Sequence, residues 1–276
     1  MPHPTDREPV HEPKAPIVSV DQLTIKYGSA LAVDQVTFAL QQGDQVAVIG
    51  PNGAGKSTLF KAIAGILSPT TGFVQIGGSQ PMQHICIAYI PQRSQIDWSF
   101  PVTVADAVLM GRVGRLGWLR RPRAEDRDFV QTCLRHVRMD GLANRRIDAL
   151  SGGEQQRMFI ARALAQEAEV MLMDEVMSAC DVPSQEEIYR ILAMLKEQQV
   201  TIMVSTHDLD DAAARYDQVM LLNRQLIGFG SATDVFTPEK LKQAYGGHLR
   251  LVQTAQGLMV LSDATCCGGG EGHQHG

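Results

Sequence analysis

The residues from Gly50 to Ser57, GPNGAGKS, have the types and the spacing of a loop that binds a phosphate chain. They fit the pattern G-x-x-x-x-G-K-[ST], in which glycines let backbone N–H groups wrap around phosphates. A helix that begins near Gly55 would direct the positive end of its dipole at them. Lys56 would then reach the β- and γ-phosphates of a nucleotide, and Ser57 would place its hydroxyl on Mg²⁺. The residues assigned to nucleotide binding here are Gly50, Asn52, Gly53, Gly55, Lys56, Ser57 and Thr58.

An acid pair, Asp174 and Glu175, closes the apolar run VMLMDE. In an open α/β sheet, ligands bind beyond the carboxyl ends of the strands. At that edge Asp174 would hold Mg²⁺ through the coordination shell of the ion. Glu175 would polarise a water in line with the γ-phosphate. The alternative is a pair of acids that caps a following helix. The phosphate-binding loop in the same chain favours the catalytic interpretation.

Two further polar residues follow apolar runs and are expected at the same edge of the sheet. His207 in VSTHD could hydrogen-bond the γ-phosphate, although a lone histidine in a loop more often serves local structure. Gln92 in YIPQR could contact Mg²⁺ or the attacking water. The predicted catalytic set is therefore Glu175, His207 and Gln92, and the predicted Mg²⁺ set is Ser57, Gln92 and Asp174.

The elements that must position these side chains alternate between strand and helix. Apolar runs over residues 44–50, 169–175 and 199–208 predict buried strands, and the segments after the first two runs have apolar residues at helical spacing. Strands that alternate with helices predict an α/β fold, with a mostly parallel sheet covered on both faces. The apolar positions expected on the first helix are Leu59, Phe60, Ile63 and Leu67.

Other patterns predict the rest of the architecture. Residues 17–27 and 30–40 alternate and are rich in β-branched residues, which indicates an N-terminal antiparallel β portion. Residues 103–147 are expected to be helical, and residues 216–230 to form a hairpin. Two later helices are expected to begin with capping boxes. The pairs with that spacing are Ser151 with Glu154 and Ser184 with Glu187.

The composition of the 276-residue chain excludes several classes of protein. Its 44% of hydrophobic and 20% of charged residues are typical of globular proteins, and the net charge of −5 argues against a nucleic-acid binder. No apolar run approaches the roughly 18–20 residues that span a bilayer, and the start lacks the apolar stretch of a secretory signal. The five cysteines argue against a disulfide framework and fit a reducing compartment, because their number is odd and three are scattered.

The segment LSGGEQQR places Ser151 and two glycines at the expected start of a helix. A plain helix cap would account for it, but such an N-terminus could also bind phosphate. The chain already has one phosphate-binding loop. A second one therefore implies two nucleotides or a second subunit.

With all of its motifs taken in order, the sequence resembles the ATP-binding subunit of an ABC transporter. The motifs are Tyr27 in KYGS, then GPNGAGKST, PQ, LSGGE, VMLMDE, SACD and STHD, over roughly residues 17–250. The resemblance implies a P-loop NTPase (RecA-like) core with an inserted helical subdomain. It also implies ATP and Mg²⁺ as cofactors, and two copies in a head-to-tail sandwich around two ATP molecules. Val176 and Cys180 depart from the residues usual in the family, but neither departure removes a catalytic group.

The resemblance assigns a role to each matching residue. Tyr27 would stack on adenine, and Glu175 would be the general base. His207 would be the γ-phosphate switch and Gln92 the sensing glutamine. The residues that would contact the ATP of the second copy or lie at the dimer seam are Ser151, Gly152, Gly153 and Asp181.

Details of the resemblance narrow the kind of ABC protein. The stretch from Gln92 to Ser151 suits a small helical subdomain and is far too short for the long coiled coil of chromosome-maintenance relatives. The single set of motifs argues against the translation-factor and drug-resistance branches. The resemblance therefore implies a separate permease, a peripheral position on the cytoplasmic face of the plasma (inner) membrane, and an extracytoplasmic solute-binding protein as an indirect partner.

The segment PQRSQIDWSFPVTVADAVLMGR resembles the corresponding sequence in ATP-binding subunits of importers for manganese, zinc or chelated iron. The first hypothesis is therefore an ATPase that energises a metal-ion importer, with manganese or zinc as the expected cargo. A siderophore, haem or cobalamin importer is an alternative. A soluble ABC-type ATPase that regulates another process without a permease is a hypothesis of a different class.

Trp98 and Phe100 lie in RSQIDWSFP, between Gln92 and the expected helical subdomain. Exposed aromatic residues suit a partner surface, because they bury a large area at low entropic cost. We therefore consider both as permease contacts. The alternative is that they pack inward and anchor the helical subdomain, and both roles could be partly true.

We expect three regions along the chain. Residues 1–15 form a disordered extension, residues 16–250 the nucleotide-binding domain with its helical subdomain at about 100–155, and residues 251–276 a C-terminal extension. The C-terminal extension contains residues that could bind a soft metal. Adjacent cysteines on a glycine-rich tail do not have the spacing of a structural zinc site, so a disordered tail is the alternative. These ligands are Cys266, Cys267, His273 and His275.

Overall fold

A six-stranded sheet with the order β5-β6-β7-β3-β8-β9 forms the centre of the molecule. The computed structural model describes residues 15–81, 86–116, 121–178, 180–246, 249–254 and 257–262. Neighbouring strands from β5 to β8 run parallel, and β9 pairs antiparallel with β8. The predicted α/β class and the hairpin predicted over residues 216–230 are therefore confirmed. The strands are β3 (Gln45–Ile49), β5 (Ile87–Ile90), β6 (Val170–Asp174), β7 (Thr201–Thr206), β8 (Gln218–Asn223) and β9 (Gln225–Gly230).

The register of the parallel strands aligns their carboxyl ends. Ile49 at the end of β3 pairs with Thr206 at the end of β7, and Ser205 of β7 pairs with Asp174 at the end of β6. The chain therefore leaves these three strands at one edge of the sheet. The phosphate loop, Glu175 and His207 each follow directly after one of these strand ends.

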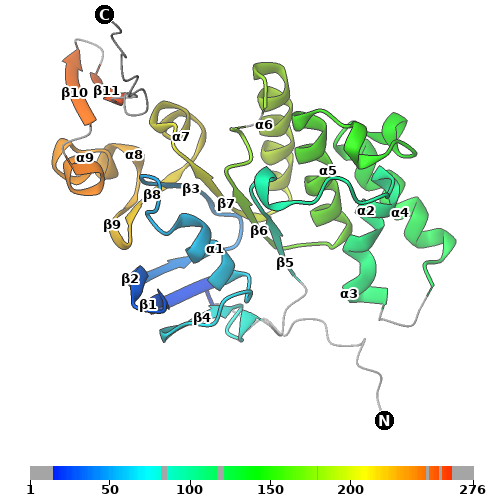
Figure 1. The fold of residues 1–276 in the computed structure, drawn as a ribbon, viewed down its shortest axis with the longest axis horizontal. Helices are drawn as coiled ribbons and strands as arrows, with labels where there is room; N and C mark the ends of the chain where they lie inside the picture. The colour runs from blue at the N-terminus through cyan, green and yellow to red at the C-terminus, as the bar shows by residue number, and fades with distance from the viewer. Residues whose placement is uncertain are drawn as a thin grey trace, which may run out of the picture.

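A second sheet is antiparallel, with the order β2-β1-β4. It packs beside helix α1, and both lie on the same face of the central sheet (Figure 1). Phe38 of β2 and Phe229 of β9 meet edge to face, with ring centroids 6.1 Å apart, which joins the two sheets. The predicted N-terminal antiparallel portion is therefore confirmed. Its strands are β1 (Val18–Tyr27), β2 (Ala30–Leu40) and β4 (Thr71–Ile76), and the helix is α1 (Lys56–Ile63).

Strand residues alternate between two hydrophobic clusters, because successive side chains of a strand point to opposite faces. Val46 and Val48 of β3 belong to the cluster with α1 and the antiparallel sheet. Ala47 and Ile49 belong to the other cluster, which is built with the remaining helices. Both faces of the central sheet are thus covered, as the near-continuous apolar runs predicted. Helices that contribute to the second cluster include α6 (Val182–Glu197), α7 (Leu209–Arg215), α8 (Ala232–Val235) and α9 (Pro238–Tyr245).

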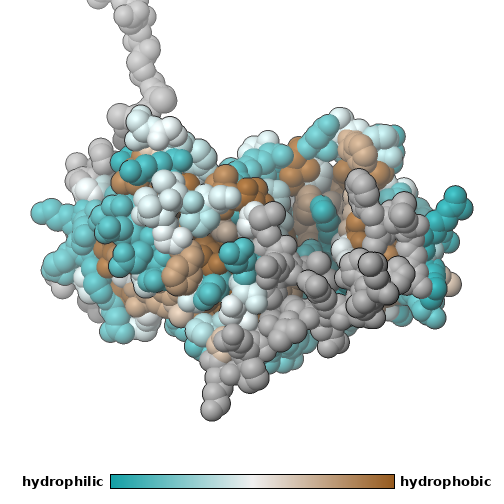
Figure 2. All heavy atoms as spheres, turned by 90° about the horizontal axis from the view of Figure 1, so that it is seen from below, coloured by the Kyte–Doolittle hydropathy of each residue, from teal (hydrophilic) through white to brown (hydrophobic). Residues whose placement is uncertain are grey.

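Between β5 and β6 the chain builds a helical part at one end of the molecule, drawn in green in Figure 1. The space-filling view shows a notch in the outline between this end and the opposite lobe (Figure 2). Residues 103–147 were expected to be helical, and the structure divides them into α2 (Val104–Leu109), η3 (Met110–Arg112), α3 (Val113–Leu116), α4 (Ala124–His136) and η4 (Asp140–Leu142). Outside these elements lie η2 (Arg93–Gln95), which precedes them, and η5 (Ile147–Ala149) and α5 (Gly152–Ala165), which follow them.

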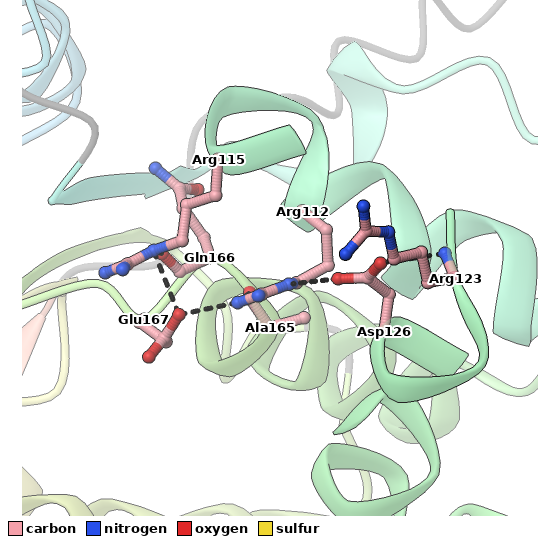
Figure 3. A network of polar contacts seen from close by, with 7 residues as sticks. All are labelled: Arg112, Arg115, Arg123, Asp126, Ala165, Gln166 and Glu167. Carbon is pink, nitrogen blue, oxygen red and sulfur yellow. Dashed lines mark hydrogen bonds and ion pairs between the residues drawn. The ribbon is translucent and has the colours of Figure 1, made fainter. Parts of the chain in front are cut away.

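A polar network fastens the segment that follows α2 to the carboxyl end of α5 (Figure 3). Arg112 pairs with Glu167 at 2.5 Å and with Asp126 at 3.6 Å, and its guanidinium lies 4.8 Å from the centroid of the Phe129 ring. Arg115 pairs with the same Glu167 at 2.9 Å. One turn of α3, the start of α4 and the end of α5 are held together by these contacts.

Two details of the predicted helices are wrong. Helix α1 ends at Ile63, so Leu67 lies beyond it, because the chain turns at Gly65 with a φ of 72°. Helix α6 begins earlier than the Ser184–Glu187 pair predicted, with Asp181 as its N-cap: the Asp181 side chain accepts a hydrogen bond from the N–H of Ser184. By contrast, the capping box of Ser151 and Glu154 is present at the start of α5.

The C-terminal part of the described chain ends in a hairpin of β10 (Leu249–Thr254) and β11 (Gly257–Ser262). Of the helices in the ranges given above, none has the length and apolar content to span a membrane. The predicted tail ligands Cys266, Cys267, His273 and His275 lie outside the described residues, as does nearly all of the N-terminal extension.

Candidate functional site

The phosphate loop connects the end of β3 to the first turn of α1. Gly53 and Gly55 adopt φ angles of 78° and 96°, in the left-handed region that favours glycine. A Cβ atom on Gly55 would also lie 2.5 Å from the carbonyl oxygen of Ala32 in β2. The loop therefore needs glycine at position 55 both for its backbone angle and for the close approach of β2.

A cavity of about 330 Å³ opens over this loop. Glu175, which follows the end of β6, lines this cavity together with the loop residues that were predicted to bind phosphate. The lining also includes Arg224, from the turn between β8 and β9. The lining residues are Leu31, Ala32, Asn52, Gly53, Ala54, Gly55, Lys56, Ser57, Thr58, Glu175 and Arg224.

Lys56 is buried and folds back over the loop. Its Nζ donates hydrogen bonds to the carbonyl oxygens of Gly50, at 2.7 Å, and Pro51, at 3.2 Å. Burial lowers the pKa of Lys56, and the nearby carboxylates of Glu175 and Asp174 oppose that shift in part. A buried cation with two uncharged carbonyl partners is well placed to bind an anionic ligand in the cavity.

The acid pair sits in a chain of hydrogen bonds that crosses three strands. Asp174 is fully buried, and its Oδ1 accepts a hydrogen bond of 2.7 Å from the Ser205 hydroxyl. The backbone N–H of Glu175 donates to that same hydroxyl oxygen at 2.8 Å. The Tyr89 hydroxyl donates to Oδ2 of Asp174 at 3.3 Å, and Gln92 Nε2 donates to Oε2 of Glu175 at 2.7 Å. Glu175 and Gln92, each predicted to be catalytic, are thus in direct contact.

Glu175 has a φ of 50°, which is uncommon for a residue with a side chain. Strain of this kind costs roughly 1–3 kcal/mol and concentrates at functional positions. The turn after β6 places Glu175 in the wall of the cavity, whereas Asp174 is fully buried at the end of β6. The two neighbouring acids therefore occupy different environments, as their two predicted roles require.

The residues present fit a bound Mg²⁺. Its preferred donors are oxygens, and the predicted set offers the hydroxyl of Ser57, the carboxylate of Asp174 and the amide of Gln92. A fully buried carboxylate such as that of Asp174 is costly to keep ionised unless charges or hydrogen bonds compensate it. A divalent cation at the mouth of the loop would add its charge to the hydrogen bonds that Asp174 accepts from Ser205 and Tyr89.

The other predicted residues are not among those that line the cavity. His207 follows β7 and is exposed, and Tyr27 at the end of β1 is 52% exposed. The signature residues Ser151, Gly152 and Gly153 form the start of α5, and Asp181 caps the adjacent α6. A Cβ atom on Gly153 would lie 2.4 Å from Cβ of Ser184, so the starts of α5 and α6 are in contact. The roles of these residues stay predictions.

The two aromatic residues of RSQIDWSFP lie in different surroundings. Trp98 is half-buried and meets Phe159 of α5 edge to face, with ring centroids 5.8 Å apart. Its Nε1 donates to the carbonyl oxygen of Arg93 at 3.1 Å. Phe100 is 54% exposed. Trp98 therefore packs inward in this state, and the predicted permease contact stays a prediction that fits Phe100 better.

The sequence interpretation did not include Tyr89, Ser205 or Arg224. Tyr89 and Ser205 stand on apolar strands, and nothing local to either indicates a partner far along the chain. Arg224 carries a clearer signal, since it is a basic residue in the tight turn of a predicted hairpin. Its φ of 58° and the hydrogen bond from its N–H to the carbonyl of Ala54 fix it beside the loop.

Comparisons with known proteins agree with this geometry. A family model described as ABC transporter matches residues 33–178, just over half of the chain. The manganese transport system ATP-binding protein MntB of Halalkalibacterium halodurans is 42% identical over 249 residues, which cover 90% of this chain and 99% of that protein. The zinc transport system ATP-binding protein TroB of Treponema pallidum is 42% identical over 233 residues, covering 84% and 88%.

Solved structures give the same result for the fold. A structure assigned to a metal-chelate type ABC transporter, in an inward-facing conformation, superposes with a TM-score of 0.76 at 28% identity and covers 90% of this chain and 99% of its own. The predicted α/β P-loop NTPase fold is therefore confirmed. Since the family model spans more than half of the chain and the relatives align along most of their length, this chain belongs to the ABC transporter family.

Proposed function

We propose that the chain is the ATP-binding and ATP-hydrolysing subunit that energises a membrane permease importing metal ions, with manganese or zinc as cargo. The observation that carries the ATPase part is the cavity in which the phosphate loop faces Glu175. The cargo rests on the relatives, one of which is named for manganese transport and another for zinc transport.

Residues that line the cavity, and others expected to act beside it, each support one part of the reaction. Lys56 and the loop N–H groups would hold the β- and γ-phosphates, and the adenine would stack on the exposed ring of Tyr27. Mg²⁺, held by Ser57, Asp174 and Gln92, would neutralise charge on the phosphates. Glu175 would take a proton from the attacking water, and Gln92, now bonded to Glu175, would orient that water.

A second copy of the chain would complete the site. Within one copy, the residues that line the cavity include none from the signature segment 151–153. The ATP-binding cassette MJ0796, a structural relative, has been solved as a dimer bound to ADP and Pi. In a head-to-tail dimer, Ser151, Gly152 and Gly153 would contact the ATP held by the other copy, with Asp181 at the seam.

The subunit would work at the cytoplasmic face of the plasma (inner) membrane, with a solute-binding protein delivering the metal on the opposite side. ATP binding would close the dimer, and hydrolysis followed by product release would reopen it. The exposed Phe100, beside the loop that carries Gln92, is the side chain that we expect to meet the permease. Co-purification with a permease, and uptake that depends on manganese or zinc, would separate this function from a soluble regulator and from a siderophore, haem or cobalamin importer.

The Glu175→Gln variant tests the ATPase assignment. We expect kcat to fall at least about 100-fold, because a general base contributes roughly 10²–10⁴ in rate, while ATP affinity is retained. Steady-state hydrolysis at saturating ATP and equilibrium ATP binding measure the two quantities separately. Glu186→Gln, an exposed glutamate paired with Arg215, is the control and should hydrolyse ATP normally. Normal turnover by Glu175→Gln would refute the base assignment.

A further inference from the structure

Strand β5 and the loop after it contact both members of the acid pair. Tyr89 lies one residue before the end of β5, and Gln92 follows two residues after it. The Tyr89 hydroxyl donates to Asp174, and the Gln92 amide donates to Glu175. The predicted roles account for the second contact but not for the first. The Tyr89 contact reaches the residue expected to hold Mg²⁺.

Asp174 has a hydrogen bond on each of its oxygens. Oδ1 accepts from Ser205 at 2.7 Å and Oδ2 accepts from Tyr89 at 3.3 Å. The carboxylate is fully buried at the end of β6, with strands on both sides. Its plane is therefore set by two hydroxyl groups from the neighbouring strands, β7 and β5.

Tyr89 is the donor in its hydrogen bond to Asp174, because a carboxylate oxygen can only accept. Its ring packs against the hydrophobic cluster around α1. The ring thus fixes where the hydroxyl points, and the hydroxyl fixes where Asp174 points.

Carboxylates that bind metals are themselves usually hydrogen-bonded, and loss of such a partner typically lowers metal affinity 10- to 100-fold. On this basis we propose that Tyr89 is a positioning residue, which orients the Asp174 carboxylate toward the divalent cation of the nucleotide site. The inference rests on the proposed ATPase function. It adds a residue whose position is fixed by β5, the strand that precedes Gln92 in the chain.

The Tyr89→Phe variant removes only the hydroxyl oxygen and keeps the ring. The probe is Mn²⁺ in place of Mg²⁺, titrated by electron paramagnetic resonance in the presence of a non-hydrolysable ATP analogue. We expect the Kd for Mn²⁺ to rise about 10-fold. Affinity for the same analogue in EDTA should stay unchanged, because the phosphate loop does not involve Tyr89. A merely structural role would weaken nucleotide binding in EDTA as well and lower Tm.

Tyr216→Phe is a matched control. Tyr216 is also buried, and its hydroxyl has no hydrogen-bond partner among the residues that the structure describes. Its removal should leave Mn²⁺ affinity unchanged. A chain with 4-aminophenylalanine at position 89 restores an N–H donor at the same place and should recover most of the lost affinity, even if the phenylalanine variant folds less well.

The outcomes separate this inference from the function on which it rests. If the unaltered chain binds the analogue without any dependence on Mn²⁺, the proposed ATPase site itself is wrong. If the unaltered chain shows that dependence and Tyr89→Phe keeps the same Mn²⁺ affinity, the positioning role is wrong and the ATPase proposal stands. A loss of affinity that 4-aminophenylalanine fails to restore would also overturn the positioning role.

Discussion

At the scale of single residues, Gly50 marks the point where the phosphate loop passes over the backbone of β8. A Cβ atom at this position would lie 2.0 Å from the carbonyl oxygen of Leu222 and 2.9 Å from Cβ of Ala54. The first of these atoms belongs to a central strand that cannot move aside cheaply. Glycine is therefore required at position 50 by its neighbours in space, in addition to any contact with a nucleotide.

We predict that Gly50→Ala destabilises the chain by about 1–3 kcal/mol, the usual cost of forcing an extra carbon into a packed region. Urea unfolding measures this change as a lower midpoint with an unchanged m value. Gly141→Ala is the control, because a Cβ atom there meets nothing within 4 Å. Equal stabilities for the two variants would contradict the predicted collision.

The residues that could be predicted from the sequence are those whose chemistry is encoded by local spacing. The glycines, Lys56 and Ser57 lie within one short motif. Asp174 and Glu175 lie at the end of an apolar run that predicts a buried strand. The contact between Leu222 and Gly50 could not be predicted, because the two positions meet only after the sheet has formed. The same holds for Tyr89 and Ser205, whose partner Asp174 is supplied by another strand.

At the scale of elements, the network around Arg112 joins helices within the helical part (Figure 3). The Arg112 side chain is only 16% exposed and bridges Asp126 of α4 and Glu167 beyond α5. Backbone contact reinforces it, since a Cβ atom on Gly111 would lie 2.3 Å from the carbonyl oxygen of Arg162. The turn after α2 is thus held by α4 and α5 together.

We predict that Arg112→Met costs about 1–3 kcal/mol, because it leaves the largely buried Asp126 without its cation. Arg115→Met should cost less than about 1 kcal/mol, since Arg115 and Glu167 are 38% and 42% exposed and water screens their pair. Both values follow from urea unfolding curves monitored by circular dichroism. Equal losses from the two variants would show that Arg112 holds these helices no more firmly than a surface ion pair does.

Helix starts show where sequence reasoning fails at this scale. Both Asp181 and Ser184 could cap α6, and the spacing of Ser184 and Glu187 matched the expected box. Asp181 is the cap in the structure, and Pro183 lies in the first turn, where its missing N–H costs nothing. The side chain of Glu187 binds Arg138 instead. Pro183, two residues after Asp181, is a local signal for the earlier start, because proline is favoured in the first turn of a helix.

At the scale of the whole molecule, the signature segment and the phosphate loop belong to different parts of one chain. Ser151 is an exposed N-cap at the start of α5, whereas Lys56 begins α1 beneath the opposite face of the sheet. The order of motifs along the sequence predicted two half-sites. Their pairing across a second copy depends on an assembly of two chains.

We predict that the Glu175→Gln chain with ATP elutes at about twice the 30.2 kDa mass of one chain. Adding Ser151→Glu should keep it monomeric, because a carboxylate at the seam would repel the triphosphate of the other copy. Light scattering after gel filtration measures both masses. Thr103→Glu is the control, since Thr103 is likewise the N-cap in a capping box, at the start of α2. If Ser151→Glu still dimerised, the signature segment would not lie at the seam.

The edge-on contact of Trp98 with Phe159 also gives the molecule a built-in optical reporter. The chain has two tryptophans, Trp98 and Trp118, so replacement of Trp118 by phenylalanine would leave a single emitter. That indole lies in the segment between Gln92 and α2, in contact with Phe159 of α5. Its emission maximum and lifetime would therefore record, in real time, whether this segment rotates away from α5 when nucleotide arrives.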